Sequence, residues 1–379
     1  MMKLRSPLLL CLLSALVLAA CSSSSTRPQP SPLPVFSSAA ELREQWSHGP
    51  GKLRDALLRP GLAGGSVYAA GEQGEVIRID AAGRRVWRAD TDIRLSGGVA
   101  SDGGVVLVGG SEGELVALDA DSGKLRWRTA VGGEILSLPL IADDLALVRV
   151  GDYQIAAYGL TDGKRRWVYQ RTQSPLALRS HNGFVRSGDV VLAGFSGGKL
   201  VALSLAGGLQ RWEATIAQPR GANELERMAD VVGEPVLVGE MVCAASFQGR
   251  VTCVDRTSGQ LRWARDIPST TGLAADGDSL YVVDSLDAVY SLDVATGSTR
   301  WKQEKLGYRQ LVRPLVVGTR LVVADAQGYI HVLDRSNGTF VARARADSSG
   351  VFAPMLALPN DGFATQTRDG EVIAWSFKR

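Results

Sequence analysis

Short runs of apolar residues recur along the whole chain, and each run ends just before a polar turn that contains glycine. Clear examples read GEVIRID, GELVALD, GKLVALS, GRVTCVD and GYIHVLD. Their apolar positions alternate with polar ones or fill a strand length, are rich in Val, Ile and Leu, and lack the 3.6-residue period of a helix. The pattern therefore predicts β-strands from one end of the chain to the other.

The apolar runs belong to a larger repeat of roughly 40 residues, the length that a blade of a β-propeller needs. Tetratricopeptide and ankyrin repeats have shorter periods and helical patterning. The sequence therefore predicts an all-β protein, an eight-bladed β-propeller with four-stranded blades. The last strand residues before the turn, 38 to 51 positions apart, are Asp80, Asp119, Gly159, Ser204, Asp255, Asp293, Asp334 and Ser376.

One copy of the repeat can be divided into its strands. The run Val105 to Gly109 is expected to pair with a second strand that ends at Asp119, because a glycine-containing turn lies between them. The sequence DADSGK then supplies side chains that cap a turn, with Gly123 at a position of positive φ. We expect an outer strand to follow and to end on Trp127.

Tryptophan occupies the same position in almost every copy, and Ala342 stands there in the seventh. A row of tryptophans can stack on sugars or quinones, but a residue that recurs with the repeat serves the repeat. We interpret these side chains as wedges between neighbouring blades. They are Trp46, Trp87, Trp127, Trp167, Trp212, Trp263 and Trp301.

The eighth copy is incomplete, because the sequence ends at Arg379 soon after its third strand. Trp46 lies 41 residues before Trp87, at the phase of an outer strand. We therefore predict that the strand around Trp46 pairs with residues 371–377 and completes blade eight, which leaves no open sheet edge. The propeller is expected to span residues 41–379.

The N-terminal segment has the features of a secretory signal. Lys3 and Arg5 precede an apolar run, and the sequence LAAC that ends at Cys21 resembles a bacterial lipobox. The alternative is an ordinary signal peptide followed by a chance cysteine. Because Cys21 stands at the expected cleavage site, we predict a signal peptide over residues 1–20 and acylation of Cys21. The Ser- and Pro-rich residues that follow predict a flexible tether over residues 21–40.

Composition and charge fit a folded protein without a nucleic-acid site. The 379 residues are 45% hydrophobic and 21% charged, and 43 of them are glycines, which suits many tight turns. Removal of residues 1–20 lowers the basic count from 42 to 40, against 39 acidic residues. The charges are well mixed along the chain, so we expect no nucleic-acid partner.

Catalytic and metal-binding patterns are scarce. His48, His181 and His331 fall at different phases of the repeat, and no P-loop, Gly-x-Ser-x-Gly or His-Glu-x-x-His motif occurs. Cys243 and Cys253 are expected on adjacent strands of one hairpin, nearly opposite each other if the loop has three residues. They either form a disulfide or remain two small buried hydrophobic residues; the demanding geometry of a cross-strand bridge favours the second.

Two copies of the repeat are longer than the rest. Trp167 and Trp212 are 45 residues apart, Trp212 and Trp263 are 51 apart, and both insertions precede the inner strand of the next blade. Strand alternation places the two long loops side by side on one face. Exposed Leu176 and Leu178 beside Arg179 would form a patch typical of protein interfaces, unless both leucines fold inward under the loop.

The repeated motif ALDxxSGxxxW resembles the quinoprotein-type propellers, which include PQQ-dependent dehydrogenases and the BamB family of outer-membrane assembly lipoproteins. SPLALRS, NELERMADVVGEPV and ADAQGYIHVLDRSNGTFVAR are similar to segments of the BamB family. A dehydrogenase would need a cofactor cage, calcium ligands, a catalytic Asp and typically two adjacent cysteines. No two cysteines are adjacent in this sequence, and the site residues are missing. The resemblance therefore favours the BamB family.

Membership of that family implies a non-enzymatic scaffold without cofactor or metal. The implied location is the periplasmic side of the outer membrane, in agreement with Ser22 after the acylated Cys21. The implied partners are the POTRA domains of the insertase BamA, other subunits of the β-barrel assembly (BAM) complex, and nascent outer-membrane proteins. The family's contact surface corresponds here to Leu176, Leu178, Arg179 and Asp230.

Overall fold

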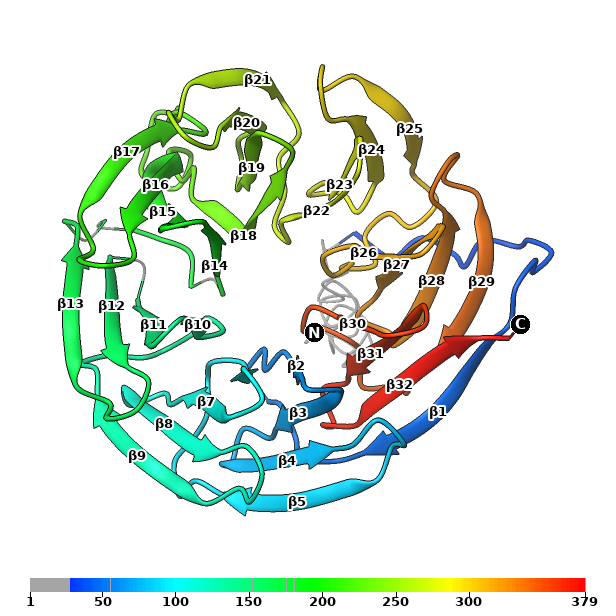
Figure 1. Cartoon of the computed structure of the whole chain (residues 1–379). Helices are drawn as coiled ribbons and strands as arrows, with labels where there is room; N and C mark the ends of the chain where they lie inside the picture. The colour runs from blue at the N-terminus through cyan, green and yellow to red at the C-terminus, as the bar shows by residue number, and fades with distance from the viewer. Residues whose placement is uncertain are drawn as a thin grey trace, which may run out of the picture.

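The protein, seen here as a computed structural model, is described over residues 28–378 except Asp55, Asp152, Gln173, Pro175 and Ser180. Within these residues, 32 strands form eight four-stranded antiparallel sheets, arranged as blades around a central axis (Figure 1). The predicted all-β, eight-bladed propeller is confirmed. The predicted signal peptide and Cys21 lie outside the described residues. The part of the chain that is described contains no helix long and apolar enough to cross a membrane.

Blades one to seven each run from the inner to the outer strand in chain order. Blades one to three are formed by β2 (Gly61–Ala63), β3 (Ser66–Ala70), β4 (Glu75–Ile79) and β5 (Arg85–Asp90); β6 (Ala100–Ser101), β7 (Val105–Gly109), β8 (Glu114–Asp119) and β9 (Leu125–Ala130); and β10 (Leu140–Ala142), β11 (Leu145–Val150), β12 (Gln154–Gly159) and β13 (Arg165–Gln170). Blades four and five are formed by β14 (Phe184–Ser187), β15 (Val190–Phe195), β16 (Lys199–Ser204) and β17 (Gln210–Thr215), with the 3₁₀ turn η2 (Ser196–Gly198), and by β18 (Val231–Val238), β19 (Met241–Ser246), β20 (Val251–Asp255) and β21 (Leu261–Arg265). Blades six and seven are formed by β22 (Leu273–Asp276), β23 (Ser279–Val283), β24 (Val289–Asp293) and β25 (Thr299–Gln303), and by β26 (Leu315–Val317), β27 (Arg320–Ala324), β28 (Tyr329–Asp334) and β29 (Phe340–Arg345).

Blade eight joins the two ends of the chain. Its sheet has the order β1 (Leu42–His48), β32 (Val372–Phe377), β31 (Gly362–Gln366) and β30 (Leu356–Leu358). The pairing runs from Leu42 opposite Phe377 to His48 opposite Val372, which confirms the predicted closure. The N-terminal and C-terminal strands are thereby paired in one sheet, which leaves no open edge between the two ends of the chain.

The hydrophobic core lies between neighbouring blades. Leu107 and Ala117 of blade two, for example, pack against Ala146 and Ala156 of blade three, and all four side chains are fully buried. Complete burial of a Val or Leu side chain contributes about 1.5–3 kcal/mol. Because every blade shares such a cluster with its neighbours, the ring is stabilised as a whole.

The tryptophans lie between blades, as the repeat predicts. Trp127 donates from Nε1 to the carbonyl of Leu160 in blade three, at 2.9 Å. Its ring covers Gly163, where a Cβ atom would come within 2.6 Å of the ring. Strand β9 continues to Ala130, so the expectation that it ends on Trp127 was wrong by three residues. The same ring-over-glycine arrangement joins Trp46 to Gly83, Trp87 to Gly123, Trp167 to Gly208, Trp212 to Gly259, Trp263 to Gly297 and Trp301 to Gly338.

Cys243 and Cys253 form a disulfide. They are directly opposite each other on β19 and β20, with Cα atoms 4.1 Å apart, and both are fully buried. The alternative of two unpaired residues, which the sequence favoured, is therefore wrong in this structure. In the structure four residues, 247–250, connect β19 to β20, and the two cysteines still face each other.

The predicted flexible tether is attached to the propeller over part of its length. The amides of Ala39 and Ala40 donate to the carbonyl of Val341, and the ring of Phe36 stacks on Phe340 with centroids 5.4 Å apart. Composition suggested a chain without packing partners, but a single aromatic residue inside the Ser- and Pro-rich stretch provides one. The expectation of a free tether is therefore wrong for residues 31–40.

Candidate partner-binding face

Two long connections lie together on one face of the ring. Residues 171–183 connect β13 to β14, and residues 216–230 connect β17 to β18. Both run from an outer to an inner strand, and strand alternation places all such connections at the same end of the blades. We call this the loop face. The amide of Leu178 donates to the carboxylate of Asp230 at 2.7 Å, and that of Gly233 to the side chain of Asn182 at 2.9 Å, so the two loops are in contact.

Asp230 is buried beneath the two loops and binds backbone amides. Its side chain is only 3% exposed, and it accepts hydrogen bonds from the amides of Leu178 and, at 3.2 Å, Gly197. Its own carbonyl accepts from the amide of Phe247 at 2.8 Å. A buried carboxylate needs such donors, which explains its position. Asp230 is therefore placed as a support of the surface, and the expectation that it projects toward a partner is corrected.

The two leucines differ in position. Leu176 is 41% exposed, whereas Leu178 is half-buried and packs against the hydrophobic cluster shared by blades five and six. The sequence predicts that both leucines are exposed, unless both fold inward under the loop. The structure gives one of each: Leu176 is exposed, while the amide of Leu178 donates to Asp230 and its side chain packs on the cluster below.

Arg179 contacts a third connection on the same face. Its guanidinium donates to the carboxylate of Glu134 at 2.7 Å, and its side chain remains 53% exposed. Glu134 lies between β9 and β10, in the connection from blade two to blade three. Arg179 is thus ion-paired with Glu134 and not with Asp230. The exposed part of the predicted patch consists of Leu176 and Arg179.

A hollow of about 440 Å³ opens beside these loops, and Leu178, His181, Phe247 and Phe352 contribute to its wall. Burial, with the nearby charge of Arg179, lowers the pKa of His181 to about 4. The imidazole is therefore neutral at ordinary pH. The wall of the hollow combines aromatic and aliphatic side chains with the charged side chains of Arg179, Glu234, Asp287 and Arg313, a mixture that suits contact with another protein.

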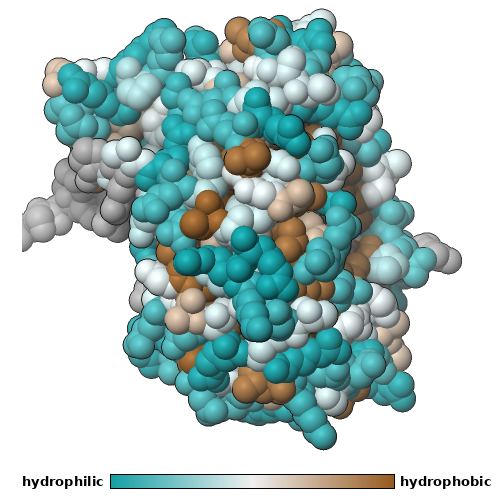
Figure 2. Space-filling model, turned by 60° about the vertical axis from the view of Figure 1, so that its left-hand side comes forward, coloured by the Kyte–Doolittle hydropathy of each residue, from teal (hydrophilic) through white to brown (hydrophobic). Residues whose placement is uncertain are grey.

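Large exposed hydrophobic side chains also occur on the loop face. Leu225 is in the second long loop, Leu286 is in the hairpin between β23 and β24, and Tyr308 is in the connection from β25 to β26. Elsewhere hydrophobic side chains lie as small separate spots among hydrophilic ones, as Figure 2 shows for one side of the molecule. Exposed hydrophobic side chains that occur singly in this way are normal for a protein surface.

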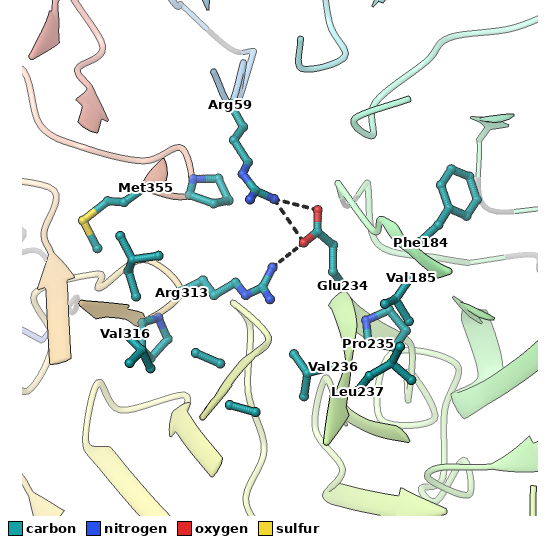
Figure 3. A pocket seen from close by; sticks show the side chains of 15 residues that line it. Arg59, Phe184, Val185, Glu234, Pro235, Val236, Leu237, Arg313, Val316 and Met355 are labelled. Carbon is teal, nitrogen blue, oxygen red and sulfur yellow. Dashed lines mark hydrogen bonds and ion pairs between the residues drawn. The ribbon is translucent and has the colours of Figure 1, made fainter. Parts of the chain in front are cut away.

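An ion-paired cluster crosses the central axis. Glu234 on β18 accepts hydrogen bonds from Arg59, which precedes β2, at 2.9 and 3.1 Å, and from Arg313, which precedes β26, at 2.6 Å (Figure 3). Glu234 and Arg313 line both the loop-face hollow and a second hollow of about 420 Å³, so the cluster lies between the two. It links blades one, five and seven.

The charge of Glu234 is set by these partners. Burial by itself would raise the pKa of the carboxyl, but the two guanidinium groups outweigh this effect and lower the pKa to about 2. The residues at the axis do not fit a calcium-bound quinone, because this carboxylate is already shared by two arginines. In the described residues, no group of three or more His, Cys, Asp or Glu side chains could hold a metal ion.

Comparison with known proteins identifies the family. A family model described as "Outer membrane protein assembly factor BamB" matches residues 72–303. A relative from Burkholderia pseudomallei with that same description is 39% identical over 96% of this chain and 96% of its own. The chain belongs to the BamB family.

Solved structures agree with this assignment. The crystal structure of BamB from Moraxella catarrhalis is 25% identical and matches with a TM-score of 0.81, over 89% of this chain and 100% of that one. A quinohemoprotein alcohol dehydrogenase from Comamonas testosteroni has a TM-score of 0.68 at 15% identity, over 88% of this chain and 76% of its own. At that identity the likeness shows a shared fold alone.

Sequence reasoning missed Glu134, Asn182 and the axial cluster of Arg59, Glu234 and Arg313. A signal was present for Glu234, which is the one charged residue within the inner strand VVGEPVLV. A charge in an otherwise apolar inner strand indicates a buried ion pair. Nothing in the sequence indicated which arginines would be its partners.

Proposed function

We propose that this protein is a non-enzymatic scaffold that assists the assembly of outer-membrane proteins, and that it docks through its loop face on the periplasmic POTRA domains of the insertase BamA. Further partners would be other subunits of the assembly complex and nascent outer-membrane proteins. Acylation of Cys21 would hold it on the periplasmic side of the outer membrane. The proposal is supported by the full-length similarity to proteins described as outer membrane protein assembly factors.

The observation that carries the docking proposal is the pair of loops tied together by Asp230. A preformed surface loses little conformational entropy on binding. It presents an apolar side chain, Leu176, beside a guanidinium, Arg179; the cores of interfaces are more apolar than their rims, and arginine is enriched in interfaces. Leu178 supports this surface from inside, so it is a poor site for a binding variant.

The test is the affinity of purified protein for the isolated POTRA region of BamA. Leu176→Ser is expected to weaken binding about tenfold, or about 1.4 kcal/mol, because an exposed leucine would lose its apolar contact. The matched control is Leu209→Ser, since Leu209 is 71% exposed in the turn between β16 and β17, on the opposite face. Unchanged affinity in Leu176→Ser, or equal loss in both variants, would place the interface elsewhere.

The enzyme alternative is a PQQ-dependent dehydrogenase, and it is not favoured. It is supported by a fold likeness at 15% identity, whereas the assembly-factor description comes from relatives that match the full chain. Titration with PQQ and calcium, followed by tryptophan fluorescence, separates the two. We expect no saturable change; a saturable one would favour the enzyme.

A further inference from the structure

Residues 31–40, which we call the N-terminal strap, follow a defined path across the propeller. Near the start of β1, the amides of Ala39 and Ala40 donate to the carbonyl of Val341 on β29. Phe36 then stacks on Phe340, and the guanidinium of Arg343 lies 4.9 Å from its ring centroid. The strap therefore crosses the outer side of blade seven.

The far end of the strap lies on the loop face. The amide of Ser31 donates to the carbonyl of Gly307 at 2.9 Å, and the carbonyl of Ser31 accepts from Arg309 at 2.8 Å. Both partners belong to the connection from β25 to β26, which runs from an outer to an inner strand like the two long loops. In Figure 1 the blue N-terminal chain accordingly turns back from the outer edge of β29 toward the ring.

The attachment point at Arg309 is rigid. This side chain is almost fully buried and pairs with the buried carboxylate of Asp325 at 2.6 Å, and it donates to Gln327 as well. Asp325 also contacts His331 at 3.0 Å. The strap therefore binds to groups that are already held in position by the fold, which lowers the entropic cost of its own ordering.

The docked strap limits how far an anchor can be from the ring. Ten residue steps lead from Cys21 to Ser31. Fully extended, they reach at most about 35 Å, whereas a free tether over residues 21–40 would reach about twice as far. The segment between Cys21 and Ser31 therefore begins at the loop face, close to the exposed side chains of Tyr308 and Leu286.

We propose that the strap delivers the lipid anchor to the loop face and thereby turns that face toward the phospholipid surface of the membrane. The inference rests on the proposed function, since it requires an acylated Cys21. The strap and the two long loops then act together: the docking surface is held on the side of the ring that is nearer to the membrane. A free tether would give no such preference.

The test uses the acylated full-length protein bound to vesicles of phosphatidylethanolamine and phosphatidylglycerol that carry an energy-transfer acceptor in the headgroups. A donor dye is attached at Ser285→Cys on the loop face or at Ala295→Cys on the opposite face, both exposed positions of blade six. The two are separated by about the length of a strand, roughly 20 Å. We expect more efficient transfer from position 285 than from position 295.

Strap variants complete the experiment. Phe36→Ala removes the ring that stacks on Phe340 and should reduce the difference between the two dye positions, while the contacts of Ser31 with Gly307 and Arg309 remain. Val35→Ala is the matched control, because Val35 is fully exposed, and should preserve the difference. Equal transfer from both positions in the protein with the native strap would overturn the inference alone. Failure of the acylated protein to float with the vesicles would instead overturn the anchor in the proposed function, and the inference with it.

Discussion

Glu234 offers the sharpest test of how the ring is held together. Replacement by Gln keeps the size of the side chain but removes the charge that Arg59 and Arg313 share. Removal of one partner of a buried ion pair costs about 3–5 kcal/mol, because the remaining charge is left without compensation. The side chains of Arg59 and Arg313 are 25% and 18% exposed, so solvent can partly compensate their charges. We therefore expect the lower end of this range, about 3 kcal/mol.

The assay is thermal unfolding followed by circular dichroism. For a propeller of this size the unfolding entropy is about 0.7 kcal/mol per kelvin, so a loss of about 3 kcal/mol lowers Tm by about 4 °C. Glu240→Gln is the matched control, because Glu240 also pairs with an arginine, Arg256, but is 75% exposed. A surface pair contributes at most about 1 kcal/mol. If Glu234→Gln lowers Tm no more than the control does, the axial cluster does not brace the ring.

The same residue predicts a pH dependence. Burial opposes ionisation of Glu234, but Arg59 and Arg313 lower its folded-state pKa to about 2. The ionised carboxylate therefore stabilises the fold at pH values above its unfolded pKa, and this contribution is lost as the pH falls from about 4.3 toward 2. The difference in unfolding free energy between the native protein and Glu234→Gln should shrink over this window. A difference that stays constant would contradict the assigned charge state.

Two further variants test the closure and the loop support. Deletion of residues 41–50 removes β1 and should lower Tm far more than deletion of residues 22–30, because it exposes the edge of β32; equal melting temperatures would contradict closure by the N-terminal strand. Asp230→Ala removes the acceptor of two loop amides and should cost about 1.5–3 kcal/mol per lost bond to a charged group, with faster hydrogen exchange at the amide of Leu178. Exchange no faster than in Asp266→Ala, whose side chain is 82% exposed, would show that the carboxylate does not hold the loop.

The sequence was sufficient for features that arise within one repeat. Asp119 accepts hydrogen bonds from the amide and hydroxyl of Ser122, and Gly123 adopts a φ of 71°, as the turn signature predicts. The spacing of the tryptophans likewise follows from contacts between adjacent copies. Closure by the strand around Trp46 could be predicted because the last copy lacks an outer strand.

The site depends on contacts between residues that are distant in the sequence. Asp230 and Leu178 are 52 residues apart, and Glu234 and Arg59 are 175 apart. Whether a carboxylate such as Asp230 faces solvent or the base of a loop is decided only when the blades meet. The same reason explains the strap: Pro34 and Arg343, which its path brings together, are 309 residues apart.

The most direct test of the docking proposal is to find what lies against Leu176 in living cells. A photo-crosslinking amino acid would be placed at position 176 and, as a control, at position 209, which is more exposed and lies on the opposite face. We predict crosslinks to the POTRA domains of BamA from position 176 and none from position 209. Crosslinks to BamA from position 209 alone, or from neither position, would contradict the proposal that the loop face binds the insertase.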